Sequence, residues 1–334
     1  MSLSAETLGR LLLAEPKLAW AEVFSSLWSE LSVPVTEGDV AAEMVRRDKV
    51  FESLDLVLSS AAWDLWLSFE ASTEATAEAL VGFWNAQPGG KAVLVLDALS
   101  LRETPWILQE AAKRGYTVKS ARPTASALPS DTTSFARALG LPQRSALTAG
   151  KVASLRLAEA TTAFFDQPWS ECADTLPNSP NLFVWHDWPD TLMHDLSGAG
   201  PGLRQLAEDA KTVLTGDGFW SFIDRLAQGR RVVITADHGY AASGLFSDVP
   251  DESQKAYYQQ TFGAERFAPS PDQGASHWLP PVDIAMATAR GPHRFALGRR
   301  GWRVQSGRKN LSHGGLSVLE TAVPFIELSK SQQA

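Results

Sequence analysis

The sequence predicts an α/β fold with a mostly parallel central sheet flanked by helices, preceded by an all-helical N-terminal region. Three observations predict it. Short apolar runs end in a carboxylate or a histidine, as buried parallel strands do at the ligand-binding edge of a sheet. Helical patterns alternate with these runs, which is the order typical of parallel sheets covered by helices. The first part of the chain, in contrast, has helical periodicity throughout.

Residues 1–88 carry this helical pattern, with apolar side chains three and four positions apart, as at Val23, Leu27 and Leu31. Five of the chain's 12 tryptophans lie here, at positions 20, 28, 63, 66 and 84. We interpret them as helix packing, and a docking surface for a protein partner is the alternative. A Pro-Gly-Gly break at residues 88–90 ends the region, so we expect a second unit over residues 89–330.

Four short apolar segments predict the strands of the sheet, namely residues 91–97, 116–119, 181–187 and 230–239. Helical patterns alternate with these strands, at residues 104–114, 202–214 and 219–228. Residues 240–281 are rich in Ser, Asp, Gln and Pro and have weak periodicity. We expect them to form an irregular excursion between sheet elements.

Composition describes an ordinary folded protein. The 334 residues, 44% hydrophobic and 20% charged, exclude disorder and low complexity as descriptions of the whole chain. The net charge of −8 excludes the overall basic field on which nonspecific nucleic-acid binding depends. The single cysteine, Cys172, can form neither an intramolecular disulfide nor a thiolate zinc site. Any metal chemistry must therefore use histidine and carboxylate side chains.

The sequence shows no segment for membrane insertion or export. The apolar run at residues 11–14 is too short for the core of a signal peptide. No stretch of about 18 uncharged apolar residues, the length that a membrane-spanning helix needs, occurs. We therefore expect a cytoplasmic protein without a membrane partner.

Metal-capable side chains follow the first and the last predicted strand. Asp97 ends the first, and Asp237-His238-Gly239 ends the last. Because ligands bind at the carboxyl ends of the strands of an open α/β sheet, we expect these side chains at one edge. Burying two polar groups without a partner is costly, which favours a bound cation. Gly239 permits the tight turn that lets both neighbours reach one ion.

Two further segments add candidate ligands. Asp190 and His194 are four residues apart, which places a carboxylate and an imidazole on the same face of a helix. His313 lies beside glycines that allow a close backbone approach. The complete set of candidate metal ligands is Asp97, Asp190, His194, Asp237, His238 and His313. Such a set suits two divalent ions, each with three protein ligands and open positions for a substrate.

Taken singly, most members of this set have an ordinary alternative. Asp97 could cap a helix, Asp190 and His194 could form a surface pair, and His313 could be a simple loop residue. The combination favours metal binding. Mixed nitrogen and oxygen ligation favours Zn²⁺ over Ca²⁺ or Mg²⁺, and Mn²⁺ is the alternative.

The ordered set of motifs resembles the PglZ domain of the alkaline phosphatase superfamily, over residues 91–328. The matching segments are Val-Leu-Val-Leu-Asp97, Pro-Ser-Asp-Thr-Thr at residues 129–133, Asp190-x-x-x-His194, Thr235-Ala-Asp-His-Gly239 and His313-Gly-Gly-Leu-Ser317. The last of these, continued to Pro324, is the most specific single match. The resemblance implies an alkaline-phosphatase-like fold with two metal sites.

The resemblance also implies a role for each ligand. One metal site takes Asp190, His194 and His313, and the other takes Asp97, Asp237 and His238. A threonine hydroxyl is the implied nucleophile, because coordination to a dication lowers its pKa without the help of a histidine base. Thr132 is the first choice, and Thr133 stays open because the neighbouring hydroxyls leave the register undecided by one residue.

Four further side chains are candidates for holding the anionic oxygens of a substrate, namely Arg137, His186, Arg308 and Lys309. Arg137 lies about one helical turn beyond the two threonines, and Arg308 and Lys309 shortly precede His313. His186 ends the middle strand, where it could touch substrate or a metal ligand. An ordinary surface or structural role is the alternative for each of them.

The function implied by the resemblance is a two-metal-dependent phosphohydrolase that acts on a phosphodiester or a nucleotide, within a bacterial phage-defence system. Nucleic acid enters only as a substrate. Two alternatives stay open. A catalytically idle scaffold of a defence complex would bind protein partners through residues 1–88, and a phosphoglycerate-mutase-like isomerase would use a serine near the first aspartate, at Ser100.

Overall fold

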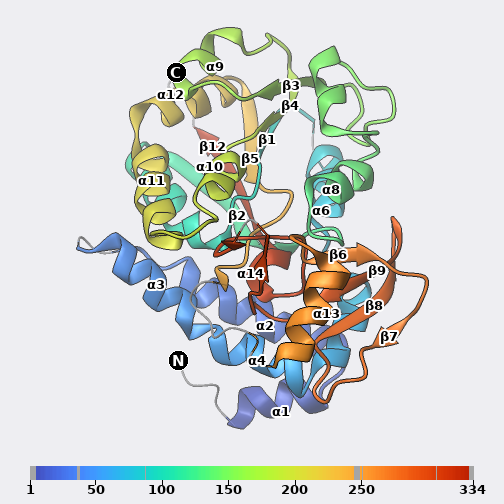
Figure 1. The fold of residues 1–334 in the computed structure, drawn as a ribbon. Helices are drawn as coiled ribbons and strands as arrows, with labels where there is room; N and C mark the ends of the chain where they lie inside the picture. Colours follow the sequence, from blue (N-terminus) through green and yellow to red (C-terminus); the bar gives the residue numbers. More distant parts are fainter. Residues whose placement is uncertain are drawn as a thin grey trace.

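A six-stranded sheet forms the centre of the structure, a computed structural model that describes residues 5–35, 38–86, 88–243, 249, 251–305 and 307–330. The strand order is β2-β12-β5-β1-β4-β3 (Figure 1). The strands span Gly90–Leu96 (β1), Tyr116–Ala125 (β2), Thr161–Phe165 (β3), Asn181–His186 (β4), Arg230–Thr235 (β5) and Ala322–Lys330 (β12). Strand β12 pairs antiparallel with both β2 and β5, whereas β1, β3, β4 and β5 pair in parallel. The predicted class, α/β with a mostly parallel sheet, is confirmed.

Helices cover both faces of the sheet, and β1 shows how its sequence serves both. Alternate side chains of a strand point to opposite faces. Ala92, Leu94 and Leu96 pack in one core cluster with α7 (Thr104–Lys113), α11 (Leu203–Thr215) and α12 (Asp217–Leu226). Val93 and Val95 pack in another with α6 (Thr76–Asn85) and α8 (Thr132–Ala138). Because both faces of β1 are buried, its sequence is a continuous apolar run rather than an alternating one.

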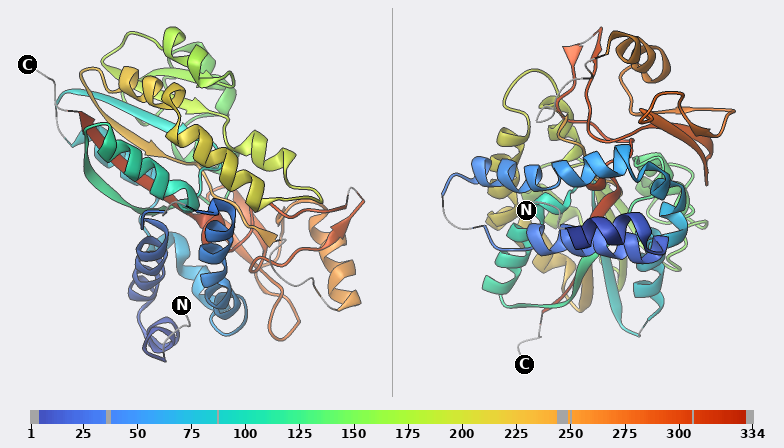
Figure 2. Two further views of the ribbon diagram at one scale, coloured as in Figure 1. Left: turned by 90° about the vertical axis from the view of Figure 1, so that its left-hand side faces the viewer. Right: turned by 90° about the horizontal axis from the view of Figure 1, so that it is seen from below.

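Most described residues before β1 are helical. The helices up to residue 60, in blue, lie below the sheet in Figure 1 and in the left view of Figure 2, whereas α6 packs on one face of the sheet. Besides α6, the helices are α1 (Ala5–Leu13), α2 (Pro16–Leu31), α3 (Val40–Val50), α4 (Glu52–Ser60), α5 (Phe69–Ser72) and the 3₁₀ helix η1 (Trp63–Ser68). Trp20 is buried against Trp66 and Phe69, with ring centroids 4.8 and 4.9 Å away. These aromatic side chains pack helix on helix.

The domain boundary between residues 88 and 89 stays a prediction. Side chains from both sides of it, such as Leu27 and Leu319, pack in one core cluster. The partner-binding alternative for the helical region is also left as a prediction. Among the described residues, no helix combines the length and the apolar character that crossing a membrane requires.

The segment after β5 is more regular than its composition predicts. It contains a helix, α13 (Glu252–Phe262), whose N-terminus is capped by the Asp251 carboxylate. A small antiparallel sheet follows, with the order β6-β9-β8-β7 and the strands Phe267–Pro269 (β6), Gly274–Ala275 (β7), Asp283–Thr288 (β8) and Gly291–Ala296 (β9). The expected irregular excursion over 240–281 was therefore wrong for α13. Its buried residues are only Tyr258 and Phe262, so the apolar stripe is too narrow to give a clear period.

Short elements between the larger ones carry many of the residues discussed below. They are the 3₁₀ helices η2 (Leu101–Glu103) and η3 (Arg144–Ala149), the helices α9 (Trp169–Thr175), α10 (Asp190–Asp195) and α14 (Val318–Thr321), and the strands β10 (Arg303–Val304) and β11 (Gly307–Arg308).

Candidate metal centre

The neighbouring strands β1 and β5 deliver two carboxylates to one point. They pair in parallel with Val95 opposite Thr235, so Asp97 and Asp237 leave the sheet side by side. The backbone N–H of Ala98 donates to Asp237 Oδ1 at 3.0 Å. The N–H of Asp97 donates to the carbonyl of His186, which extends the pairing with β4 beyond the strand. Backbone hydrogen bonds thus fix where both carboxylates lie.

Helix α10 supplies the next two candidate ligands. The N–H of Asp190 donates to the carbonyl of Asp97 at 3.0 Å, which joins the start of the helix to the end of β1. His194 Nε2 lies 3.4 Å from Asp190 Oδ1. His313 Nε2 lies 4.0 Å from the same oxygen, although it comes from the loop before α14. The prediction that Asp190 and His194 share one face of a helix is confirmed.

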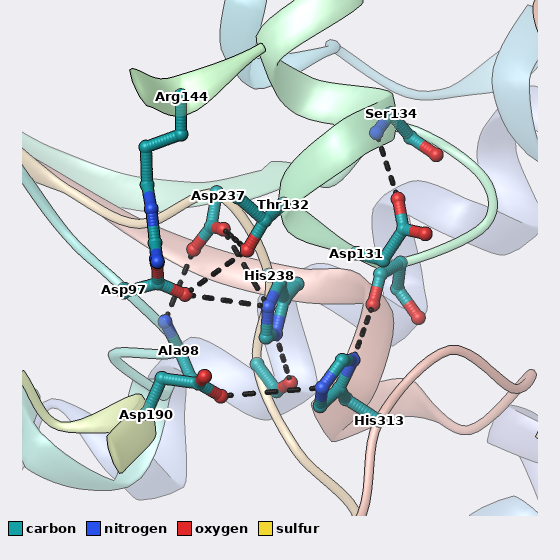
Figure 3. Close-up of polar contacts among 12 residues, drawn as sticks. Asp97, Ala98, Asp131, Thr132, Ser134, Arg144, Asp190, Asp237, His238 and His313 are labelled. Carbon is teal, nitrogen blue, oxygen red and sulfur yellow. Dashed lines mark hydrogen bonds and ion pairs between the residues drawn. The ribbon is translucent and has the colours of Figure 1, made fainter. Parts of the chain in front are cut away.

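Two histidines are oriented by carbonyl groups. His238 Nδ1 donates to the carbonyl of Gly239 at 2.9 Å, and His313 Nδ1 donates to the carbonyl of Ser130 at 3.2 Å. The rings stack with centroids 4.1 Å apart (Figure 3). With Nδ1 engaged in this way, Nε2 of each neutral imidazole is an acceptor, as in histidines that bind a metal.

Glycines make these approaches possible. A Cβ on Gly239 would lie 2.2 Å from the carbonyl oxygen of Leu319, so close backbone contact rather than an unusual turn requires glycine there. Gly314 has a φ of +101°, which side chains rarely allow, and a Cβ would meet the Phe267 ring at 2.6 Å. The expectation that the glycines beside His313 permit a close approach is confirmed.

Two groups of three ligand atoms, each group within 4.8 Å, result among the described residues. One is Asp190, His194 and His313, and the other is Asp97, Asp190 and His238. Asp190 belongs to both. Asp237 Oδ2 lies 3.5 Å from His238 Nε2, beside the second group.

The electrostatics of the cluster favour a cation. Burial and the carboxylates of Asp237 and Asp190 raise the pKa of Asp97 well above its ordinary value. Burial lowers the pKa of His238, but the carboxylates of Asp237, Asp97 and Asp190 outweigh it and raise that pKa to about 9. Burial and the neighbouring His238 and His194 lower the pKa of His313 well below its usual range. Carboxylates so close together repel one another unless a positive charge lies between them.

Two buried atoms of the cluster test whether a metal ion fits. Asp190 Oδ1 and His238 Nε2 have no hydrogen-bond partner among the described residues. A buried polar atom without a partner costs about 1–3 kcal/mol. Both atoms are ligand types that Zn²⁺ and Mn²⁺ accept, and both belong to the second group. The donor set therefore fits divalent metal ions.

Thr132 is the first residue of α8, and its hydroxyl points into the cluster (Figure 3). Oγ1 lies 2.9 Å from Asp237 Oδ2 and 3.2 Å from Asp97 Oδ1. Asp131 caps the helix by accepting the N–H of Ser134 at 2.7 Å. Thr133 has no hydrogen bond to the described residues of the cluster. The structure thus brings Thr132, and not its neighbour, against the two carboxylates.

Arg144 is a cluster residue that sequence reasoning missed. It begins η3, and its Nη1 donates to Asp97 Oδ2. The guanidinium lies 5.0 Å from the centroid of the Phe164 ring, and a third of the side chain is exposed. Trp185 Nε1 donates to the same carboxylate oxygen at 3.1 Å. No motif marks Arg144, because its distance from Asp97 depends only on tertiary packing.

Of the four predicted substrate-binding side chains, only that of Lys309 acts on a described ligand: besides burial, its positive charge contributes to the lowered pKa of His313. Arg137 is exposed on α8, without a contact to the described ligands. The His186 ring stacks on Trp169 with a centroid distance of 3.9 Å, so that only its backbone carbonyl touches Asp97. Arg308 and Lys309 both form hydrogen bonds with Ser243. The Ser243 carbonyl accepts from the Arg308 guanidinium at 3.2 Å, and the Ser243 hydroxyl donates to the backbone carbonyl of Lys309 at 2.8 Å.

Ser100, the residue on which the isomerase alternative depends, caps η2. Its hydroxyl accepts the backbone N–H of Arg102 at 3.4 Å and the Nη1 of the same residue at 3.0 Å.

Comparisons with known proteins give remote likenesses. No protein-family model and no curated protein matches the chain. Among solved structures, phosphonoacetate hydrolase from Sinorhizobium meliloti 1021, in complex with phosphonoformate, is similar at 13% identity and a TM-score of 0.42, covering 73% of this chain and 91% of that one. Murine ectonucleotide pyrophosphatase/phosphodiesterase 5, as an inactive variant with AMP, is similar at 10% identity and a TM-score of 0.41, covering 73% and 88%. A second structure of that murine protein is similar at 11% identity and a TM-score of 0.40, covering 72% and 88%.

Proposed function

We propose that the protein is a phosphohydrolase that depends on two divalent metal ions and acts on phosphodiesters or nucleotides, with Thr132 as the nucleophile. One observation carries the proposal. The Thr132 hydroxyl lies within hydrogen-bond distance of two buried carboxylates, Asp97 and Asp237. Those carboxylates adjoin an imidazole, His238, whose Nε2 has no hydrogen-bond partner among the described residues. Polar groups of these types at the carboxyl ends of parallel strands are a site for ligands.

We assign the ligands to the two ions as the resemblance implies, with Asp237 in the second set beside the described group of Asp97, Asp190 and His238. One metal ion would be held by Asp190, His194 and His313, and the other by Asp97, Asp237 and His238. Asp190 is close enough to both groups to contribute to either. Zinc is the proposed metal, with manganese as the alternative. When bound, the ions would neutralise the anionic oxygens of the phosphoryl group and lower the pKa of the attacking hydroxyl.

The protein's own groups hold and activate the nucleophile. Asp237 Oδ2 accepts the hydrogen bond of the Thr132 hydroxyl and is placed to take its proton. The helix that begins at Thr132 is held at its start, because Asp131 caps it and forms an ion pair with Arg290 at 2.6 Å. The position of Oγ1 is therefore set before a substrate binds, which lowers the entropic cost of attack.

Arg144 is the proposed contact for the substrate. Its guanidinium reaches Asp97 at the cluster and is partly open to solvent, so it can pair with phosphoryl oxygens that enter there. A guanidinium matches two oxygens of a phosphate ester at once. Arg137, His186, Arg308 and Lys309 stay predictions for this role.

The five motifs support membership of the PglZ domains, and with it a cytoplasmic phage-defence system as the setting. The competing proposal is an idle scaffold that binds protein partners through its helical N-terminal region. The complete set of six ligands and the orientation of Thr132 favour catalysis over an idle site.

The deciding experiment uses purified, zinc-loaded protein and an Asp237→Ala variant. Metal content is measured, and turnover is followed on bis-p-nitrophenyl phosphate, p-nitrophenyl phosphate, cyclic nucleotides and oligonucleotides. We expect the parent to cleave a diester or a nucleotide and Asp237→Ala to lose both activity and metal. Full metal occupancy without turnover on any of these esters would instead support the scaffold.

A further inference from the structure

A network of buried charges joins the N-terminal helices to the ligand-bearing loops. Its centre is Asp48 in α3, whose side chain is 0% exposed, as are those of Arg102 in η2 and Arg299. Arg102 Nε donates to Asp48 Oδ1 at 2.8 Å, and Arg299 Nη1 donates to Asp48 Oδ2 at 2.7 Å. One carboxylate from the helical region thus holds two buried guanidinium groups.

Arg102 connects the loops that follow β1 and β5. Its Nη1 donates to the carbonyl of Tyr240 at 2.8 Å and to the hydroxyl of Ser100 at 3.0 Å. Tyr240 is two residues beyond His238, and Ser100 is three residues beyond Asp97. The guanidinium also lies 4.5 Å from the centroid of the Tyr240 ring. A single side chain therefore ties together the two loops that carry candidate ligands.

Arg299 connects the same network to the loop that carries His313. Arg299 Nε lies 2.6 Å from Asp55 Oδ2, and Asp55 Oδ1 accepts the backbone N–H of Val318 at 3.0 Å. Val318 is five residues beyond His313. Asp48 and Asp55, both from the N-terminal helices, thus support the loops of Asp97, His238 and His313.

Buried ion pairs of this kind contribute little net stability, since the cost of removing charges from water offsets their attraction. Their value lies in fixing geometry, and ligand groups must be held within about 0.5 Å of their working positions. We propose that Asp48 is a positioning residue of the metal centre. It holds Arg102 so that the loops of Asp97 and His238 keep the spacing at which both side chains can bind one ion. The inference rests on the metal centre of the proposed function.

A matched control is available within the chain. Asp283 is also 0% exposed and forms an ion pair with Arg294, but the pair joins β8 to β9 in the small sheet and contacts none of the described ligand loops. Removing either carboxylate leaves a guanidinium with fewer partners, fully buried at Arg102 and Arg299 and 14% exposed at Arg294, so both variants should lose stability. Only the change at Asp48 should disturb the ligands.

The test compares Asp48→Asn with Asp283→Asn in the full chain. Zinc affinity is measured by competition with a chelator, stability by denaturant unfolding, and local opening by hydrogen exchange of residues 98–103 and 239–242. We expect Asp48→Asn to weaken zinc binding about 10- to 100-fold, the range for a residue that orients metal ligands. We also expect faster exchange in both loops. Asp283→Asn should lower stability and leave both measurements at parental values.

A double variant guards against simple misfolding. Asp48→Asn with Arg102→Met removes the carboxylate and one unpaired charge together, so it should be more stable than Asp48→Asn alone. Zinc affinity should remain low, because the Tyr240 carbonyl and the Ser100 hydroxyl still lack the guanidinium. The proposal is overturned if Asp48→Asn and the double variant keep parental zinc affinity and loop exchange. Failure of the parent to bind zinc would instead reject the proposed function, and loop exchange alone would then decide the role of Asp48.

Discussion

The hydroxyl oxygen of Thr132 lies 2.9 Å from Oδ2 of Asp237, a residue 105 positions later in the chain. Thr133 follows it directly but forms no hydrogen bond with the described cluster. Thr132→Ala should therefore lower the turnover of bis-p-nitrophenyl phosphate by at least about 10³-fold, as loss of a nucleophile does. Thr133→Ala should leave turnover within about twofold, since a substitution away from the reacting atoms costs little.

Zinc content is the control for this pair. Both variants keep all six proposed protein ligands, so both should bind zinc at close to the parental content. A larger loss of turnover in Thr133→Ala than in Thr132→Ala would show that Thr133 is the nucleophile.

Asp190 is the one residue that both groups of ligand atoms share among the described residues. Asp190→Asn should therefore weaken both metal sites, whereas His194→Gln should weaken only one. Zinc retained after dialysis against a graded chelator series measures the difference. Metal bound only to the folded state stabilises it by about 2.7 kcal/mol at a concentration 100 times Kd. Equal losses in the two variants would show that Asp190 serves a single ion.

Arg144 donates to Asp97, whereas Arg137, the arginine that the motif spacing predicts, is exposed. Arg144→Gln should lower kcat/KM for a diester about 10²-fold, the effect of removing one preorganised donor from an anionic transition state. Arg144→Lys should keep part of the activity, because lysine carries the positive charge but lacks the planar guanidinium that binds two oxygens at once. Arg137→Gln is the matched variant. A larger loss of kcat/KM in Arg137→Gln than in Arg144→Gln would assign the substrate contact to Arg137, as the sequence analysis predicts.

Glu103 gives the fold a dependence on pH. Burial raises the pKa of Glu103 to about 7. Hydrogen bonds from the Tyr240 hydroxyl and the Ser100 N–H, together with the charge of Arg102, lower this pKa but do not outweigh burial. The unfolded chain releases this proton near its ordinary pKa of 4.5. Between those values the folded state holds more protons, so the free energy of unfolding falls as pH rises to about 7 and changes no further above it.

Glu103→Gln isolates this contribution. The variant cannot ionise, so its stability relative to the parent should improve by up to about 3 kcal/mol across that pH window. Denaturant unfolding of both proteins at a series of pH values measures the change. A difference in stability that is constant with pH would show that Glu103 is ionised throughout.

Much of the candidate site follows from local pattern. Asp97 and Asp237 meet because each ends a buried apolar run, and neighbouring parallel strands end at one edge. Asp190 and His194 meet because helix geometry brings residues four apart together. Such features are set by residues adjacent in sequence, and sequence analysis can find them.

Other parts of the site depend on packing between distant segments and leave no periodic trace. Arg144 and the pairs of Asp48 with Arg102 and Arg299 are of this kind. The sequence analysis predicted neither β3 nor β12 as a strand. Nothing in the sequence of residues 322–330 indicates that this strand enters the sheet antiparallel. The small helix α13 was missed because its apolar side is narrow.

The position of β12 has a consequence for how the chain is made. It lies between β2 and β5, yet it follows all the other strands along the chain. Until the ribosome has released residues 322–330, β2 and β5 each present an unpaired edge, and such edges recruit other strands. Chains in which residues 322–330 have not yet entered the sheet are therefore exposed to pairing with one another through these edges.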